Sequence, residues 1–171
     1  MASFIDDPEE FQRLDFEILQ NGSVSLYFRS PILEEDISWL KANQYRVDSF
    51  DCDGWMDEAA LLKDFGLTME FPDYYGQNFN ALNDCLSDVD VADNGGRAIV
   101  LNRFDSFAAK NPDGAEVLLN ILDENSRHHL MFGRRVLILV QSNDPEIRFD
   151  AIGRYGATWN RQEWLNSSRG L

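Results

Sequence analysis

The sequence contains few cysteines and few basic residues. Its two cysteines, Cys52 and Cys85, are too few for a disulfide framework in a chain of 171 residues, and their spacing does not fit a metal site. The 30 acidic residues outnumber the 15 Lys and Arg, which gives a formal charge of −15. We therefore expect nucleic acid and anionic membranes to repel the chain, and a basic protein partner to be attracted to it.

Long apolar runs are also missing. The longest aliphatic run, Val136–Val140, is far too short to cross a membrane. The first residues turn acidic at once, which is unlike a signal peptide. Both features predict a cytoplasmic protein with reduced thiols.

The sequence has no nucleophile elbow, phosphate-binding loop, glycine-rich dinucleotide turn or zinc-protease motif. The only histidines, His128 and His129, are neighbours at a predicted helix end, where side chains diverge by about 100° and do not easily share a metal. We interpret them as complementing the helix dipole. The acidic loop 88–93 lacks the ligand order of a calcium-binding loop. We therefore predict a protein that is not an enzyme and needs no metal or cofactor.

Hydrophobic patterning predicts an α/β fold. Short apolar runs at 45–50, 98–101 and 134–141 predict strands, and helical patterns occupy the segments before and between them. Asp57 is predicted to head one of these helices, through Phe65, and Asn111-Pro112 to cap another that runs to about His129. Continuous apolar strands separated by helices indicate a parallel sheet that helices cover.

The two ends of the chain carry weaker signals. Asp15–Gln20 and Val24–Arg29 alternate apolar and polar residues around an Asn-Gly-Ser turn, which predicts a β-hairpin placed to extend or cover a sheet edge. A helix is predicted from Ser30 to about Asn43. The tail contains a possible strand near Phe149–Thr158 and a short helix near Arg161–Asn166. Since no repeat or linker separates these parts, we predict one domain over residues 1–171.

The most distinctive segment, Phe71–Val89, passes from a turn into a helix. Asn78 stands where an N-cap residue is expected. One helix face is apolar, with Phe79, Leu82 and Leu86. The other face is polar, with Asn80, Asn83, Asp84 and Asp88. No Lys or Arg occurs between Lys63 and Arg97 to pair with these acids, so the face is either an ordinary solvated surface or a protein interface.

The order Pro72-Asp-Tyr-Tyr-Gly-Gln-Asn-Phe-Asn-Ala-Leu-Asn-Asp-Cys-Leu86 resembles the signature segment of the barstar family, the intracellular ribonuclease inhibitors. The flanking segments agree in order from Tyr45 to Gln141. The resemblance implies a barstar-like core over residues 45–141, with a small parallel three-stranded sheet flanked by helices. An N-terminal addition, 1–44, with a hairpin and a helix, and a C-terminal addition, 142–171, would extend this core.

The resemblance also implies a partner-binding surface. Tyr74 matches the family's contacting tyrosine, Asp84 matches the aspartate that enters the nuclease cleft, and Glu124 matches an acidic contact on a second helix. Glu124 is predicted to lie on the polar face of that helix with Glu116, Asn120 and Asp123. Three positions depart from the prototype: Asn80 replaces an aspartate, Asn83 replaces a tryptophan, and Asp88-Val89 replaces a Gly-Trp pair. We therefore expect a partner different from the prototype's nuclease. The predicted partner-binding residues are Tyr74, Asn80, Asn83, Asp84, Asp88, Asp90 and Glu124.

Three functions remain open from the sequence. The first is an inhibitor or immunity protein that occludes a basic toxin, most simply a ribonuclease, without contacting nucleic acid itself. The second is a regulatory or adaptor module whose terminal additions, with Trp39, Trp159 and Trp164, form the working surface. The third is an enzyme that uses Asp84 and Glu124, although nothing else in the sequence indicates a substrate cleft.

Overall fold

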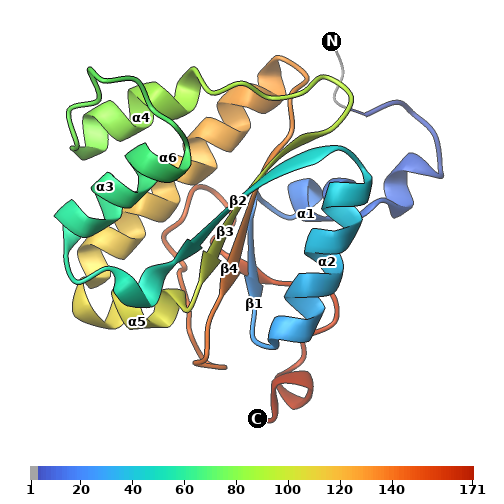
Figure 1. Ribbon diagram of the computed structural model, residues 1–171. Helices are drawn as coiled ribbons and strands as arrows, with labels where there is room; N and C mark the ends of the chain where they lie inside the picture. The colour runs from blue at the N-terminus through green and yellow to red at the C-terminus, as the bar shows by residue number, and fades with distance from the viewer. Residues whose placement is uncertain (1–3) are drawn as a thin grey trace.

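The computed structural model describes residues 4–171 and has three layers, with helices on both faces of one parallel sheet (Figure 1). The sheet has five strands in the order β2-β3-β4-β1-β5. They are β1 (Val24–Tyr27), β2 (Tyr45–Asp51), β3 (Gly96–Asn102), β4 (Val136–Gln141) and β5 (Thr158–Trp159). The α/β class and the parallel sheet are confirmed. The predicted count of three strands was wrong, because each terminal addition contributes a strand beyond β4.

Four helices cover one face of the sheet (Figure 1). They are α3 (Glu58–Thr68), α4 (Phe79–Ser87), α5 (Phe104–Lys110) and α6 (Pro112–Met131). Three of them begin at a side chain that accepts a hydrogen bond from the backbone N–H three residues ahead, which satisfies a donor that the helix itself leaves free. These N-caps are Asp57, Asn78 and Asn111. The predicted helix starts are thereby confirmed.

Helices α1 (Leu14–Gln20) and α2 (Ser30–Ala42) cover the other face. The predicted hairpin was wrong, since its first half is α1 and its second half is β1, which pairs in parallel with β4. Leu14 and Ile18 are four residues apart and both are buried, as a helix allows. Asp15 is also buried, where Tyr45 Oη donates to it at 2.7 Å. A six-residue alternating pattern does not distinguish this helix from a strand.

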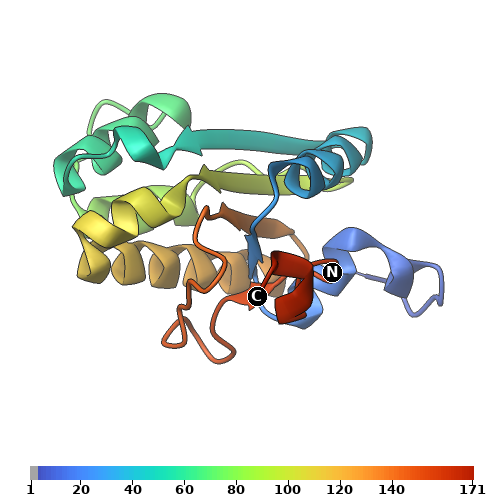
Figure 2. The ribbon, with the colours of Figure 1, turned by 90° about the horizontal axis from the view of Figure 1, so that it is seen from below.

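The C-terminal tail is mostly irregular and lies beside α1 (Figure 2), where Arg161 Nη1 is 3.0 Å from Glu17 Oε2. The strand predicted near 149–158 is only the short β5, because Gly153 and Gly156 adopt left-handed φ values of 53° and 71° and break the extended backbone. The helix predicted near 161–166 is also displaced. A 3-10 helix, η3, covers Asn166–Arg169 instead, and a turn precedes it.

Glu163 joins this tail to the junction of β1 and α2. Its carboxylate is fully buried and accepts hydrogen bonds from Phe28 N at 2.8 Å and Arg29 N at 2.9 Å. Arg29 Nε at 3.1 Å and Asn160 Nδ2 at 2.7 Å complete the set. On these contacts and on the strand pairing we base the proposal that residues 1–171 fold as one domain.

Replacing Glu163 with glutamine is expected to lower the free energy of unfolding by about 1–3 kcal/mol, because the amide has one acceptor oxygen and leaves buried N–H groups without partners. Urea denaturation followed by circular dichroism measures the change. Glu146→Gln is the matched control, since Glu146 is exposed. Equal losses in both variants would show that Glu163 does not anchor the tail.

Candidate functional site

The loop before α4 contains two adjacent tyrosines, whose side chains point in different directions. Tyr75 turns inward, where its hydroxyl donates to Leu62 O at 3.0 Å and its ring packs edge-on to Phe71 with centroids 5.0 Å apart. Burial raises the pKa of Tyr75 to about 12. A side chain at Gly66 would place Cβ only 2.9 Å from the Tyr75 ring. Tyr74 points outward and is 82% exposed, which suits the contacting role expected for it.

Helix α4 presents its polar face to solvent. Leu82 and Leu86 are buried against the core. Asn80, Asp84 and Asp88 are exposed on the opposite side. The structure therefore places these three predicted site residues on one accessible surface, held by a short helix whose inner face is packed.

Two side chains of α6 fix α4 in position. Asn125 Nδ2 donates to Asn83 Oδ1 at 2.8 Å, and His129 Nε2 lies 2.9 Å from Leu86 O, to which the N–H of that nitrogen donates. Asn125 and His129 are both buried. Asn83 is half-buried and already has this partner, so it belongs to the joint between the helices more than to the open surface.

The same joint places Asp84 and Glu124 on neighbouring helices. Asp84 follows Asn83 directly on α4, and Glu124 precedes Asn125 directly on α6. Both acidic side chains are exposed. Glu124, the acidic contact predicted on a second helix, is therefore accessible beside α4.

His129 gives this joint a pH dependence. Burial lowers the pKa of His129 below its ordinary value, although the hydrogen bond to Leu86 opposes the shift. His129 therefore binds a proton more readily in the unfolded chain than in the folded protein. The contribution of the neutral imidazole to the free energy of unfolding is complete above a pH of about 6.5, and it is lost as the pH falls through the lower pKa of His129 in the folded protein.

When the pH is lowered from about 7.5 to about 5.5, we expect the free energy of unfolding to fall more in the wild type than in His129→Gln. The glutamine amide can still donate a hydrogen bond to Leu86 O but does not take up a proton in this range. Urea denaturation of both proteins at the two pH values measures the difference. Identical pH dependence in the two proteins would contradict this assignment.

The loop after α4 is held from beneath by a buried arginine. Arg97 Nη1 donates to Asp90 O at 3.2 Å, and Arg97 Nε donates to Asp48 Oδ2 at 2.6 Å. Arg97 and Asp48 are both buried, whereas the side chains of Asp88 and Asp90 are exposed. The backbone of this acidic loop is thus fixed while its carboxylates remain accessible.

The carboxylates of this surface are not neutralised within the described part of the chain. Over residues 4–171, no basic nitrogen lies within 4.0 Å of the carboxylates of Asp84, Asp88, Asp90 and Glu124. The nearest cation along α6, Arg127, pairs with Asp123 at 3.1 Å. The described residues also contain no group of three or more His, Cys, Asp or Glu side chains placed to hold a metal ion. The arrangement offers negative charge to a partner.

One predicted surface residue is not on the surface. Asp123 was expected on the polar face of α6 beside Glu124, but it is buried and accepts a hydrogen bond from Ser23 Oγ at 2.8 Å. Asn120, expected on the same face, contacts the tail through Ala151 O at 3.2 Å. The tail covers this part of α6, which the sequence of α6 alone does not indicate.

The sequence analysis did not identify Asn125 and His129 as the α6 side chains that bind α4, although the sequence contains a signal for them. They continue the apolar row Leu118, Leu122 at helical spacing, so they occupy positions where core side chains are expected. A polar residue in such a row needs a buried hydrogen-bond partner.

Comparison with known proteins covers the middle of the chain. The family model described as Barstar (barnase inhibitor) matches residues 45–141, which is more than half of the chain. The matched residues run from β2 to β4 and include the whole acidic surface. No curated protein matches the chain. No helix within residues 4–171 is long and apolar enough to cross a membrane.

Proposed function

The chain belongs to the barstar family, and we propose on this basis that it is an inhibitor or immunity protein that occludes the active site of a basic nuclease toxin, most simply a ribonuclease. One observation carries the proposal. Asp84, the loop 88–90 and Glu124 form an acidic surface that has no basic partner among residues 4–171. The elements that carry it are held in place by buried contacts.

Such a surface can act by replacing the substrate. An enzyme that cleaves RNA keeps a positively charged cleft for phosphate groups, and carboxylates on a fixed helix can occupy that cleft. Opposite charges speed the encounter and make it sensitive to salt. Because the hydrogen bonds of Asn125 and His129 already order α4, little further ordering is needed on binding.

The proposed target is the enzyme and not its RNA. A formal charge of −15 disfavours direct contact with a polyanion. The free cysteines Cys52 and Cys85 suit the reducing cytoplasm, where we propose that the protein acts. Asn80 and Asn83 stand where the prototype has an acid and an aromatic residue, and such changes at an interface alter which partner is accepted.

A second candidate is an adaptor module that works through its terminal additions. Trp164 is 72% exposed and lines a cavity that those additions form, which favours such a role. Removing residues 1–44 would not test this cleanly, because it deletes β1 and α2 from the layered structure. Partner binding that survives Asp84→Ala and is lost in Trp164→Ala would favour the adaptor function.

The inhibitor proposal can be tested by comparative capture from the source cells at moderate salt. The baits are the wild-type protein and a Tyr74→Ala/Asp84→Ala variant, in which two exposed side chains are removed. We expect a basic nuclease to be retained by the wild type and lost by the variant. If both baits retain the same partner, α4 is only scaffold.

A further inference from the structure

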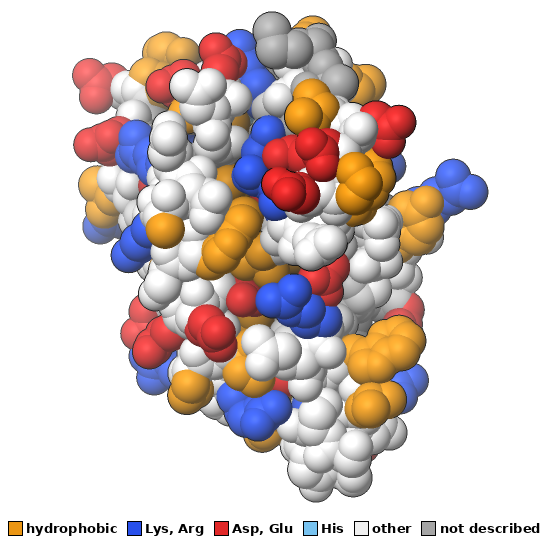
Figure 3. Space-filling model, turned by 90° about the vertical axis from the view of Figure 1, so that its right-hand side faces the viewer, with side chains coloured by type: hydrophobic (Ala, Val, Ile, Leu, Met, Phe, Trp, Pro, Cys, Tyr) orange, Lys and Arg blue, Asp and Glu red, His pale blue; other side chains and the backbone are white. Residues whose placement is uncertain are grey.

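The terminal additions enclose a cavity of about 410 Å³ on the sheet face opposite α4. Every residue that lines it lies in 14–36 or 155–164, outside the matched segment 45–141. It lies over β1 and β5, between α1 and the first half of α2, and the tail closes one side. Figure 3 faces this side of the molecule and shows apolar side chains in a hollow that charged groups border. The volume lies in the range of about 300–1,000 Å³ that is typical of small-molecule sites.

Aromatic and aliphatic side chains form two sides of the cavity, and polar side chains complete the lining. Leu14 and Ile18 of α1 form one side. Trp159 and Trp164 of the tail form another, and Arg169 lies over the Trp159 ring, with its Cζ 4.3 Å from the centroid. Trp164 is 72% exposed at the rim. Indole and phenol rings favour an apolar or aromatic body and attract a cation to their faces.

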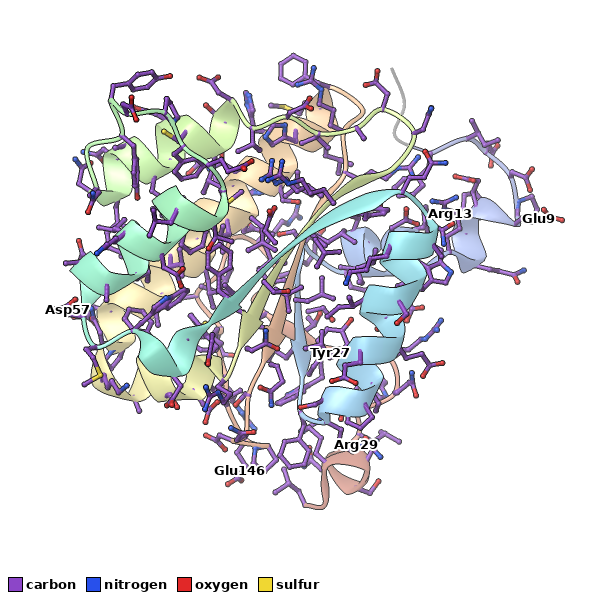
Figure 4. All side chains as sticks on the ribbon, viewed as in Figure 1. Glu9, Arg13, Tyr27, Arg29, Asp57 and Glu146 are labelled. Carbon is purple, nitrogen blue, oxygen red and sulfur yellow. The ribbon has the colours of Figure 1, made fainter. Side chains whose placement is uncertain are left out.

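Asp36 provides the buried charge of the cavity. It is only 6% exposed, and its Oδ2 accepts a hydrogen bond from Tyr27 Oη at 2.7 Å. Tyr27 extends from β1 toward α2, which carries Asp36 (Figure 4). Within residues 4–171, Asp36 Oδ1 has no hydrogen-bond partner. Among the described residues, the neutral phenol of Tyr27 is thus the only hydrogen-bonded partner of this buried carboxylate.

The other charges at the cavity do not neutralise Asp36. Arg161 is the only cation among the lining residues, and its Nη1 is 3.0 Å from Glu17 Oε2. With Glu17 so paired, the lining retains one net negative charge, that of Asp36. Burial raises the pKa of the Asp36 carboxyl, although the Tyr27 hydroxyl and Arg161 oppose the shift. A ligand cation beside this group would replace the stabilisation that burial removes.

We propose that this cavity binds a small organic amine with an aromatic or apolar body, whose ammonium group pairs with Asp36. The aromatic walls hold the body, and the ammonium group donates to the free oxygen of the carboxylate. This site is independent of the acidic surface on α4, because the two lie on opposite faces of the sheet.

The test is a titration of the ¹⁵N-labelled full chain, with amide chemical shifts as the readout. The probe is phenethylamine, which is protonated at neutral pH, and the matched probe is 2-phenylethanol, a neutral molecule of nearly the same shape. We expect phenethylamine to give saturable shifts confined to residues 14–36 and 155–164, and to bind at least about tenfold more tightly than the alcohol, as a desolvated charge pair allows.

Variants test whether the carboxylate of Asp36 is the group that pairs with the ammonium group of the probe. Asp36→Asn is expected to weaken phenethylamine binding at least about tenfold and to leave the alcohol unchanged. Tyr27→Phe keeps the carboxylate and removes its competing donor, so it should bind the amine at least as tightly as the wild type, and it tests the site even if Asp36→Asn does not fold. Asp84→Asn, on α4, should bind the amine normally. The proposal is overturned if the shifts do not saturate, if amine and alcohol bind equally, or if Asp36→Asn binds the amine like the wild type.

Discussion

Replacing Asp84 with alanine is expected to weaken binding of the cognate nuclease by about 2 kcal/mol or more, roughly a 30-fold rise in Kd. Asp84 is exposed on the outer face of α4, and no basic side chain of residues 4–171 neutralises it. Its charge is therefore free to enter the positive cleft of a nuclease, where loss of water strengthens the pairing. Isothermal titration calorimetry with the purified nuclease at moderate salt measures the change.

The control for this experiment removes the same charge elsewhere. Glu35 is exposed on α2, on the opposite face of the sheet from α4. Glu35→Ala lowers the net negative charge equally, so it should bring only the small loss in association rate that one distant charge causes. A Kd that does not change in Asp84→Ala, or equal effects in the two variants, would rule out Asp84 as a central contact.

The largest expected effect on stability is that of Arg97→Met. We expect the free energy of unfolding to fall by about 3–5 kcal/mol, because the change leaves the buried Asp48 carboxylate without its closest partner. Arg97 is 2% exposed and its Nε is 2.6 Å from Asp48 Oδ2. The same change removes the hydrogen bond to Asp90 O, so the acidic loop should also loosen. Urea denaturation at pH 7 measures the loss.

Arg46 provides a matched control on the same carboxylate. Its Nε is 3.3 Å from Asp48 Oδ1, but its side chain is 50% exposed, so Arg46→Met should cost less than about 1 kcal/mol. Replacing both buried partners, in Asp48→Leu/Arg97→Met, should recover much of the stability, since no unpaired buried charge remains. Similar losses from Arg46→Met and Arg97→Met would show that burial does not set the strength of this pair.

Local sequence signals predicted the helix starts and the buried strands, because both depend on residues that are close together in the sequence. The helix starts at Asp57, Asn78 and Asn111 were predictable, because capping involves residues only three positions apart. The apolar strands β3 and β4 were predictable from composition, since a strand buried on both faces needs apolar residues throughout.

What the sequence did not predict depends on contacts between distant segments. The segment Asp15–Gln20 alternates like a strand, and its helical form is supported by Tyr45, which is far along the chain. Asp123 is buried because Ser23 and the tail cover it, and neither is near it in sequence. The family resemblance supplied the predicted site residues, which stay a prediction. The two side chains of α6 that hold α4 in place, Asn125 and His129, required the structure.

The central claim is that this protein blocks a nuclease by occupying its active site. The most direct measurement is the rate of RNA cleavage by the captured nuclease as the protein is added, at several RNA concentrations. We predict a cleavage rate that falls in proportion to the added protein and reaches zero at an equimolar ratio. We also predict that inhibition sets in more slowly as the RNA concentration rises, because protein and RNA compete for the same cleft. A nuclease that is fully bound by the protein and still cleaves RNA at its original rate would contradict the account.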